Sequence, residues 1–142
     1  MKIYLCGRFG RRAELAEYAQ ALAEDGHEIT ATWLCETSAN DQDLTPQECQ
    51  GAAKLDTADI DRSDLVLVFS EAPDSPYGRG GRHFETGYAY AKGKRIVVVG
   101  PLENVFHYAD GIRYAPDFEK ARVGLKLLSC TMVSQSCQTF IA

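Results

Sequence analysis

The chain has 142 residues, which is enough for one domain with a single sizeable core. Its hydrophobic content of 45% and charged content of 25% are ordinary for a soluble globular protein, and no apolar run approaches the roughly 20 residues of a membrane span. The net charge of −5 disfavours binding to a nucleic acid polymer, and the five cysteines show no CxxC spacing, so neither a zinc site nor a disulfide framework is indicated.

The first half of the chain predicts two strands and two helices, at residues 2–6, 11–25, 27–34 and 46–63. The first helix carries apolar side chains at helical spacing and stops at Gly26. The second begins at Pro46, which suits a first helical turn because its missing N–H needs no partner there.

The second half predicts three more strands, at residues 65–69, 95–99 and 112–114. Between the first two lies a helix that holds Glu85, residues 103–109 form a weaker helix or turn, and a last helix covers residues 117–128. Alternation of strand and helix predicts an α/β fold, a five-stranded parallel sheet wound with helices on both faces. We expect one domain over residues 1–128 and a weakly ordered or partner-dependent tail at 129–142.

Three loops should meet at one edge of this sheet. Right-handed crossovers bring the loops that follow parallel strands to the carboxyl ends of those strands. The loops at residues 7–12, 70–82 and 100–104 all follow strands. Arginines bunch in the first two, and Glu85 lies just after the second. This edge is therefore the predicted site.

The most informative stretch is Gly80-Gly81-Arg82-His83-Phe84-Glu85-Thr86-Gly87-Tyr88-Ala89-Tyr90-Ala91. It reads as a glycine-rich loop that enters a small-residue helix with one carboxylate in the first turn. Unpaired N–H groups and the positive end of the helix dipole would suit an anionic, sugar-sized ligand. The alternative is a solvated helix start, where the dipole alone favours a glutamate.

The loop after the first strand is a candidate phosphate site. It holds two glycines and three arginines, namely Gly7, Arg8, Gly10, Arg11 and Arg12. Glycines let backbone N–H groups approach a phosphate, and arginines add bidentate contacts. A plain turn with solvated arginines remains the alternative. Neither GxGxxG nor GxxxxGK[ST] is present, so the loop does not indicate NAD or ATP chemistry.

Four aspartates crowd the end of the second predicted helix: Asp56, Asp59, Asp61 and Asp64. We interpret most of them as surface charges or caps. Asp56, one to two turns before the helix end, is the one that could point past the strand ends toward Glu85.

These segments resemble the nucleoside 2-deoxyribosyltransferase superfamily. The resemblance covers roughly residues 1–121 and is most specific where the block from Asp56 to Asp64 is combined with Glu85-x-Gly87-x-Ala89. Further matching pieces are Ile3-Tyr4-Leu5-Cys6-Gly7, Gly93-Lys94 with the strand after it, and Pro101-Leu-Glu-Asn104-Val-Phe-His107.

The resemblance implies a flavodoxin-like (Rossmann-like) fold and cleavage of an N-glycosidic bond without a metal or cofactor. Glu85 falls on the family's nucleophile, which forms a glycosyl-enzyme ester. Asp56 falls on the aspartate that orients the sugar or handles the proton on the leaving base. Tyr4 matches a tyrosine near the site, and Asn104 resembles an asparagine that reaches into a neighbouring subunit's site. The full expected substrate-binding set is Tyr4, Gly7, Arg8, Gly10, Arg11, Arg12, Gly80, Gly81, Arg82 and Asn104.

Two branches of the superfamily match this sequence to different degrees. Enzymes that exchange bases on free nucleosides carry an acidic residue just before the nucleophile helix, whereas this chain has the basic stretch Gly78-Arg79-Gly80-Gly81-Arg82. The branch that removes the base from nucleoside 5′-monophosphates has a glycine- and arginine-rich first loop, as here. We therefore expect a monophosphate hydrolase; base exchange and a silent nucleotide-binding module stay as alternatives. The base and the sugar remain open.

The same resemblance implies a homodimer or a larger homo-oligomer, because the asparagine acts across an interface. Tyr88, Tyr90, Phe106 and Tyr108 would supply an aromatic interface or, alternatively, part of the core. The chain opens directly on strand-like residues, so we expect no signal peptide and a cytoplasmic location.

Overall fold

A computed structural model describes residues 1–36 and 44–137, with side chains up to residue 128. Five strands form one parallel sheet in the order β2-β1-β3-β4-β5. The strands are β1 (Lys2–Cys6), β2 (Glu28–Ile29), β3 (Leu65–Phe69), β4 (Arg95–Val99) and β5 (Ile112–Ala115). The α-helices are α1 (Arg12–Glu24), α2 (Pro46–Arg62), α3 (Gly80–Ala91) and α4 (Phe118–Cys137). This strand order is that of flavodoxin-like folds and confirms the expected class.

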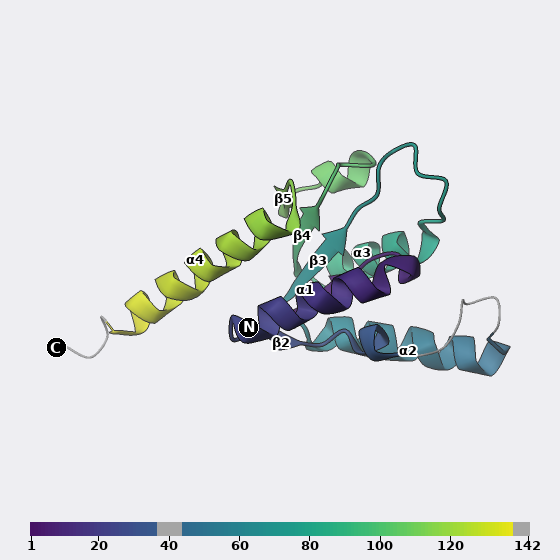
Figure 1. Cartoon of the computed structure of the whole chain (residues 1–142), viewed down its shortest axis with the longest axis horizontal. Helices are drawn as coiled ribbons and strands as arrows, with labels where there is room; N and C mark the ends of the chain where they lie inside the picture. Colours follow the sequence, from purple (N-terminus) through teal and green to yellow (C-terminus); the bar gives the residue numbers. More distant parts are fainter. Residues whose placement is uncertain (37–43, 138–142) are drawn as a thin grey trace.

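Helices cover both faces of the sheet (Figure 1). On one face Tyr18 of α1 stacks on Phe118 of α4, with ring centroids 4.0 Å apart, and on Phe69 at the end of β3. On the other face α2 and α3 pack together against β1 and β3. Every residue of β3 is buried, as its unbroken apolar run predicted.

The second strand is much shorter than the alternation over residues 27–34 predicted. Only Glu28 and Ile29 pair with β1, and a 3-10 helix, η2 (Thr32–Cys35), follows. The cause is Asp59, which is fully buried and accepts hydrogen bonds from the backbone N–H and the hydroxyl of Thr32. These bonds turn the chain out of the sheet. Asp59 is therefore an exception to the interpretation of most of these aspartates as surface charges or caps.

Helix α4 continues past the boundary predicted at residues 128 and 129 and ends at Cys137. Figure 1 shows it running outward from the sheet toward the C-terminus. Residues 138–142 of the predicted tail lie outside the described part of the chain. In the described residues no helix has the length and apolar character needed to cross a membrane.

Candidate active site

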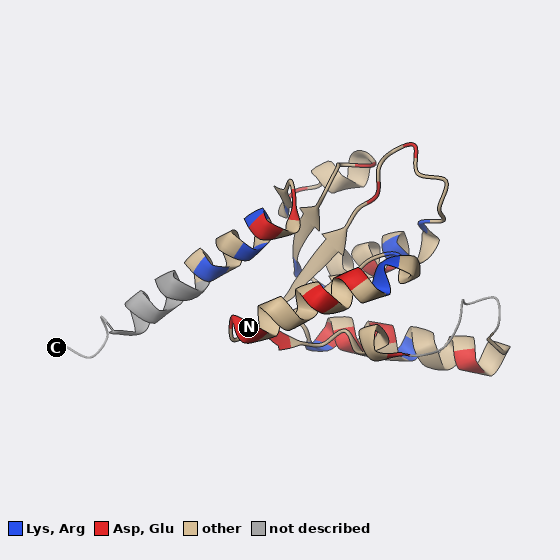
Figure 2. Cartoon of the chain, viewed as in Figure 1, with Lys and Arg blue, Asp and Glu red and all other residues tan. Residues whose placement is uncertain are grey.

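A cavity of about 390 Å³ lies at the carboxyl edge of the sheet, where the loops after β1 and β3 meet. The predicted site residues that line it are Gly7, Arg8, Asp56, Gly80, Gly81, Arg82 and Glu85. A second cavity shares Asp56 and Glu85 with it and reaches along α2 and α3 to Phe84. Figure 2 shows basic residues at the starts of α1 and α3, on the same side of the molecule. The prediction that this edge gathers the loops is confirmed.

Glu85 faces the cavity from α3 and is held by two side chains of β1. The Tyr4 hydroxyl donates to its Oε1 at 2.6 Å, and the Cys6 thiol donates to its Oε2 at 3.0 Å. Burial raises the pKa of Glu85, and the bonds from Cys6 and Tyr4, with the nearby charge of Arg82, oppose that rise. The arrangement is a partly buried carboxylate whose ionised form is stabilised by two donors and one nearby positive charge.

Glu85 lies one turn deeper in the helix than the sequence suggested. Gly80 and Gly81 are themselves helical, so α3 begins at Gly80 and its first turn contains no acidic residue. The helix dipole therefore stabilises the ionised form of Glu85 less than we expected, because its effect falls off beyond the first turn. The hydrogen bonds from Tyr4 and Cys6 of β1 stabilise the carboxylate instead. A Cβ at either glycine would meet no atom within 4 Å, so the surface beside the cavity is open.

Asp56 reaches the same cavity from α2. That helix is fixed at its start by a capping box. The Thr45 hydroxyl oxygen accepts from the backbone N–H of Glu48, and the Glu48 carboxylate accepts from the backbone N–H of Thr45. Asp56 lines both cavities that contain Glu85, and its charge contributes to raising the pKa of Tyr4. The two carboxylates predicted to work together are thus brought to one cavity.

The loop after β1 places Arg8 at the cavity wall. Its guanidinium lies 3.9 Å from the ring centroid of Tyr77 and 3.6 Å from the Glu71 carboxylate. Two glycines make room for this turn. A Cβ at Gly7 would lie 2.4 Å from a methyl carbon of Leu15, and one at Gly10 would lie 2.3 Å from Nη1 of Arg8.

Arg11 and Arg12 have other partners and do not line either of the two cavities that contain Glu85. Arg11 forms a two-bond pair with Glu14 and also donates to the Ser70 carbonyl. Arg12 donates to the Glu36 carbonyl at the end of η2. Both brace the loops around the cavity, and direct contact of either with a substrate stays a prediction.

Arg82 is buried, at 4% exposure, and its Nη2 donates to both carboxylate oxygens of Glu103 at 2.6 Å. Glu103 also accepts from the backbone N–H of Glu71. Among the described residues, four buried guanidinium nitrogens at the cavity lack a hydrogen-bond partner: Arg8 Nε, Arg79 Nε, Arg82 Nε and Arg82 Nη1. Buried donors of this kind are normally satisfied by water or a ligand.

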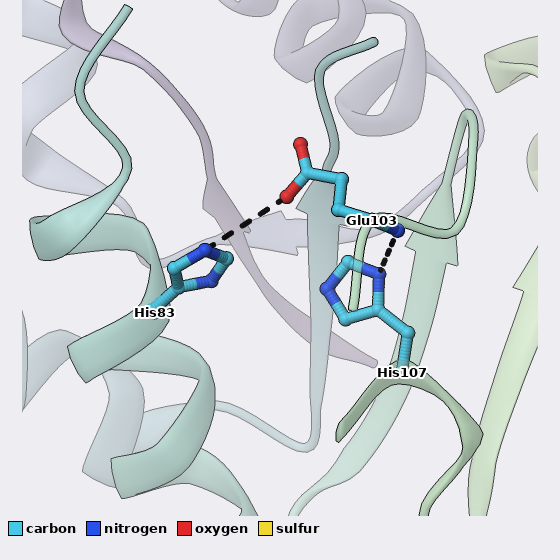
Figure 3. A group of neighbouring side chains, drawn as sticks. All are labelled: His83, Glu103 and His107. Carbon is cyan, nitrogen blue, oxygen red and sulfur yellow. Dashed lines mark hydrogen bonds and ion pairs between the residues drawn. The ribbon is translucent and has the colours of Figure 1, made fainter. Parts of the chain in front are cut away.

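Glu103 also joins a group of possible metal ligands with His83 and His107 (Figure 3). The hydrogen bonds oppose a metal ion there. His107 Nδ1 accepts the Glu103 backbone N–H, which assigns the ring proton to Nε2 and leaves that atom no free lone pair. The Glu103 carboxylate is already paired with Arg82. We interpret the group as a brace for the loop after β4.

Asn104 lies apart from Glu85. It caps a 3-10 helix, η4 (Val105–Tyr108), by accepting from the Phe106 N–H, and it lines a mostly apolar cavity of about 290 Å³ between α3 and η4. Of the aromatic residues considered for an interface, Tyr90, Phe106 and Tyr108 are 47–75% exposed, whereas Tyr88 packs against the core.

Sequence reasoning missed Cys6 and Glu103 as functional candidates, and it left Arg79, which it had noted within the basic stretch at 78–82, out of the expected substrate-binding set. Cys6 looked like an ordinary apolar strand residue. Its spacing of two from Tyr4 was the available signal, because alternate strand residues share a face. Nothing in the sequence marked Glu103 as buried.

No protein-family model matches the sequence, and no curated protein is a recognisable relative. Among solved structures, the chain is similar to a CMP N-glycosidase, BcmB, from Clostridium botulinum, with a TM-score of 0.56 and 24% identity over 89% of this chain and 99% of the other. It is also similar to a 2-deoxyribosyltransferase from Bacillus psychrosaccharolyticus, with a TM-score of 0.65 and 19% identity over 85% and 90% of the two chains. A conserved protein from Enterococcus faecalis matches 70% of this chain and 62% of its own, with a TM-score of 0.51 and 21% identity.

Both named enzymes belong to the superfamily that the sequence resembles. The likeness confirms the flavodoxin-like fold expected from that resemblance. At these identities it establishes the fold, so an argument about activity has to rest on the residues in the cavity.

Proposed function

We propose that the protein is an enzyme that hydrolyses the N-glycosidic bond of a nucleoside or deoxynucleoside 5′-monophosphate, with Glu85 as the nucleophile. The observation that carries this proposal is the partly buried Glu85 carboxylate, held by Tyr4 and Cys6 at the edge of a cavity that also contains Asp56. The structural likeness to a CMP N-glycosidase supports the same reaction class.

The chemistry has two steps. An oxygen of Glu85 bonds to the anomeric carbon while the bond from that carbon to the base nitrogen breaks, and the electron pair leaves with the base. Asp56, when protonated, donates a proton to the leaving base. Water then attacks the anomeric carbon, Asp56 takes a proton from it, and the carboxylate of Glu85 is released. No oxidant or reductant is needed.

A 5′-phosphate suits the basic end of the cavity. Arg8, Arg79 and Arg82 line it, and each has at least one buried guanidinium nitrogen that lacks a hydrogen-bond partner among the described residues. The start of α3 adds backbone N–H groups at Gly80 and Gly81, which line the same cavity. Phosphate oxygens are strong acceptors for such donors.

The test is base release, followed by chromatography, from a panel of nucleosides and their 5′-monophosphates. We expect release from a monophosphate without an added acceptor base. Glu85→Gln should abolish it, while Glu119→Gln, at an exposed position on α4, should leave it unchanged. Release only after a second base is added would indicate a transferase instead. Ligand binding with no release from any substrate would favour a silent binding module.

We also propose that the protein acts as a homo-oligomer in which Asn104 serves the site of a neighbouring copy. Val105, Phe106 and Tyr108 are more than 70% exposed beside it, which leaves an apolar surface for a partner. Asn104→Asp keeps the side-chain oxygen that caps η4 and removes the amide donor.

A mixing experiment tests this arrangement. Glu85→Gln and Asn104→Asp should each be inactive alone, and the mixture should regain activity because mixed dimers contain one intact site. Continued inactivity, with mixed dimers demonstrated by mass spectrometry, would contradict the role of Asn104 across an interface.

A further inference from the structure

Both oxygens of the Glu85 carboxylate are engaged by donors from one strand. Tyr4 donates to Oε1, and Cys6, two residues further along β1, donates to Oε2. Both donors are fully buried. Alternate residues of a strand share a face, so the face of β1 that α3 covers presents the hydroxyl and the thiol side by side. The two bonds together fix the plane of the carboxylate, which one bond alone would not do.

The thiol in this position is a donor and not a nucleophile. Burial, and then the negative charge of Glu85, raise the pKa of Cys6 well above its usual range, so sulfur keeps its proton at neutral pH. The carbonyl oxygen of Arg82 lies 3.6 Å from the sulfur, further away than Oε2 of Glu85 at 3.0 Å. The single thiol proton therefore has its shorter contact with the carboxylate.

We propose that Cys6 is a positioning residue for Glu85, whose S–H holds Oε2 and favours the ionised carboxylate inside a largely buried site. The inference rests on the proposed role of Glu85 as nucleophile. A buried carboxylate is driven toward its neutral form by desolvation, and a neutral carboxyl group is a poor nucleophile. The other groups that face Glu85 are Tyr4 from β1, Arg82 from α3 and Asp56 from α2.

The discriminating variants are Cys6→Ala, which removes the donor, and Cys6→Ser, which restores one of similar size. Loss of a hydrogen bond to a charged group costs about 1.5–3 kcal/mol, and a thiol is at the weak end, so we expect kcat of Cys6→Ala to fall about tenfold. Its KM should change little. The acid limb of its pH–rate profile should move to higher pH, because the carboxylate is less well stabilised.

Cys6→Ser should keep kcat within about threefold of the wild type and should not move the acid limb upward. Cys35→Ala, which removes an exposed thiol on η2, is the matched control and should behave as the wild type. Equal losses in Cys6→Ala and Cys6→Ser without any shift of the acid limb would assign Cys6 to packing and overturn the proposal. Wild-type kinetics in Cys6→Ala would overturn it as well.

A second readout separates this inference from the proposed function. Protein labelled with ¹³C at the glutamate carboxyl carbons can be titrated by NMR, with Glu85→Gln to assign the signal. The pKa of Glu85 should be higher in Cys6→Ala than in the wild type and should not rise in Cys6→Ser. An unchanged pKa in Cys6→Ala refutes the role of the thiol even if the wild type releases no base. A wild type that releases no base, with the expected NMR shift, refutes the proposed function alone.

Discussion

The hydroxyl of Tyr4 donates a 2.6 Å hydrogen bond to Oε1 of Glu85, although 81 positions separate the two residues in the chain. One belongs to the first strand and the other to the helix between β3 and β4. Desolvation raises the pKa of both groups, so the hydroxyl keeps its proton, and its hydrogen bond to Glu85 opposes the rise in the pKa of the carboxyl group. A substitution or displacement in either β1 or α3 would therefore alter the environment of the Glu85 carboxylate.

Tyr4→Phe should therefore reduce turnover with little effect on the fold. Removing a hydrogen bond to a charged group is worth about 1.5–3 kcal/mol, which corresponds to a fall in kcat of about 10–100-fold. The measurement is steady-state base release. Tyr18→Phe is the matched control, because the Tyr18 hydroxyl also donates to a glutamate, Glu14, at 2.9 Å but away from the cavity. Equal effects of the two variants would argue against a role of Tyr4 in the reaction.

The pH dependence follows from the raised pKa of Glu85. Its ionised form reacts, so kcat/KM should fall as the pH drops through a value above the ordinary glutamate pKa of 4.5. The contribution of Glu85 to folding stability changes with pH in the opposite direction to kcat/KM. A carboxyl whose pKa is raised in the folded state favours folding when protonated, so this contribution is lost as the pH rises from 4.5 through the folded pKa. A pH–rate profile with its acid limb at or below 4.5 would contradict the assignment.

Arg8→Ala should weaken the binding of monophosphates selectively. If the guanidinium meets the 5′-phosphate, KM for a monophosphate should rise about 10–100-fold, the value of one charge-assisted hydrogen bond, and KM for the matching nucleoside should change much less. Arg113→Ala removes an exposed positive charge on β5 and serves as the control. An equal rise in KM for the nucleoside and the monophosphate would show that Arg8 shapes the cavity without contacting the 5′-phosphate.

Asp59→Ala should destabilise the fold. The fully buried carboxylate accepts two hydrogen bonds from Thr32 and one from Arg62 at 2.6 Å, and its loss leaves the Thr32 N–H without this partner. We expect a loss of about 3 kcal/mol in the free energy of unfolding, measured by urea denaturation. Asp61→Ala, two positions on and exposed, should cost less than about 1 kcal/mol.

The sheet could be predicted from the sequence because its central strands are unbroken apolar runs. Residues 65–69 and 95–99 admit few other interpretations, and the crossover rule then places the following loops at one edge. Glu85 could be singled out for the same reason, since it follows one of those loops.

What could not be predicted depends on contacts between residues far apart in the chain. Asp59 lies among other aspartates of α2, and only the fold shows that it alone is fully buried against Thr32. Arg82 and Glu103 are 21 positions apart, and only the fold, which brings the loop after β4 against α3, shows that the two side chains pair. Side-chain pairing of this kind leaves no periodic signal.

The chain's first strand supplies both donors to Glu85, and its amino end lies at the opposite edge of the sheet from the cavity. An affinity tag or fusion partner joined ahead of Met1 would therefore leave the molecule on the side away from the reaction. Trimming residues 1–6 would instead remove the hydroxyl, the thiol and a central strand together. For immobilising the protein on a surface, the N-terminus is the attachment point that leaves the mouth of the cavity free.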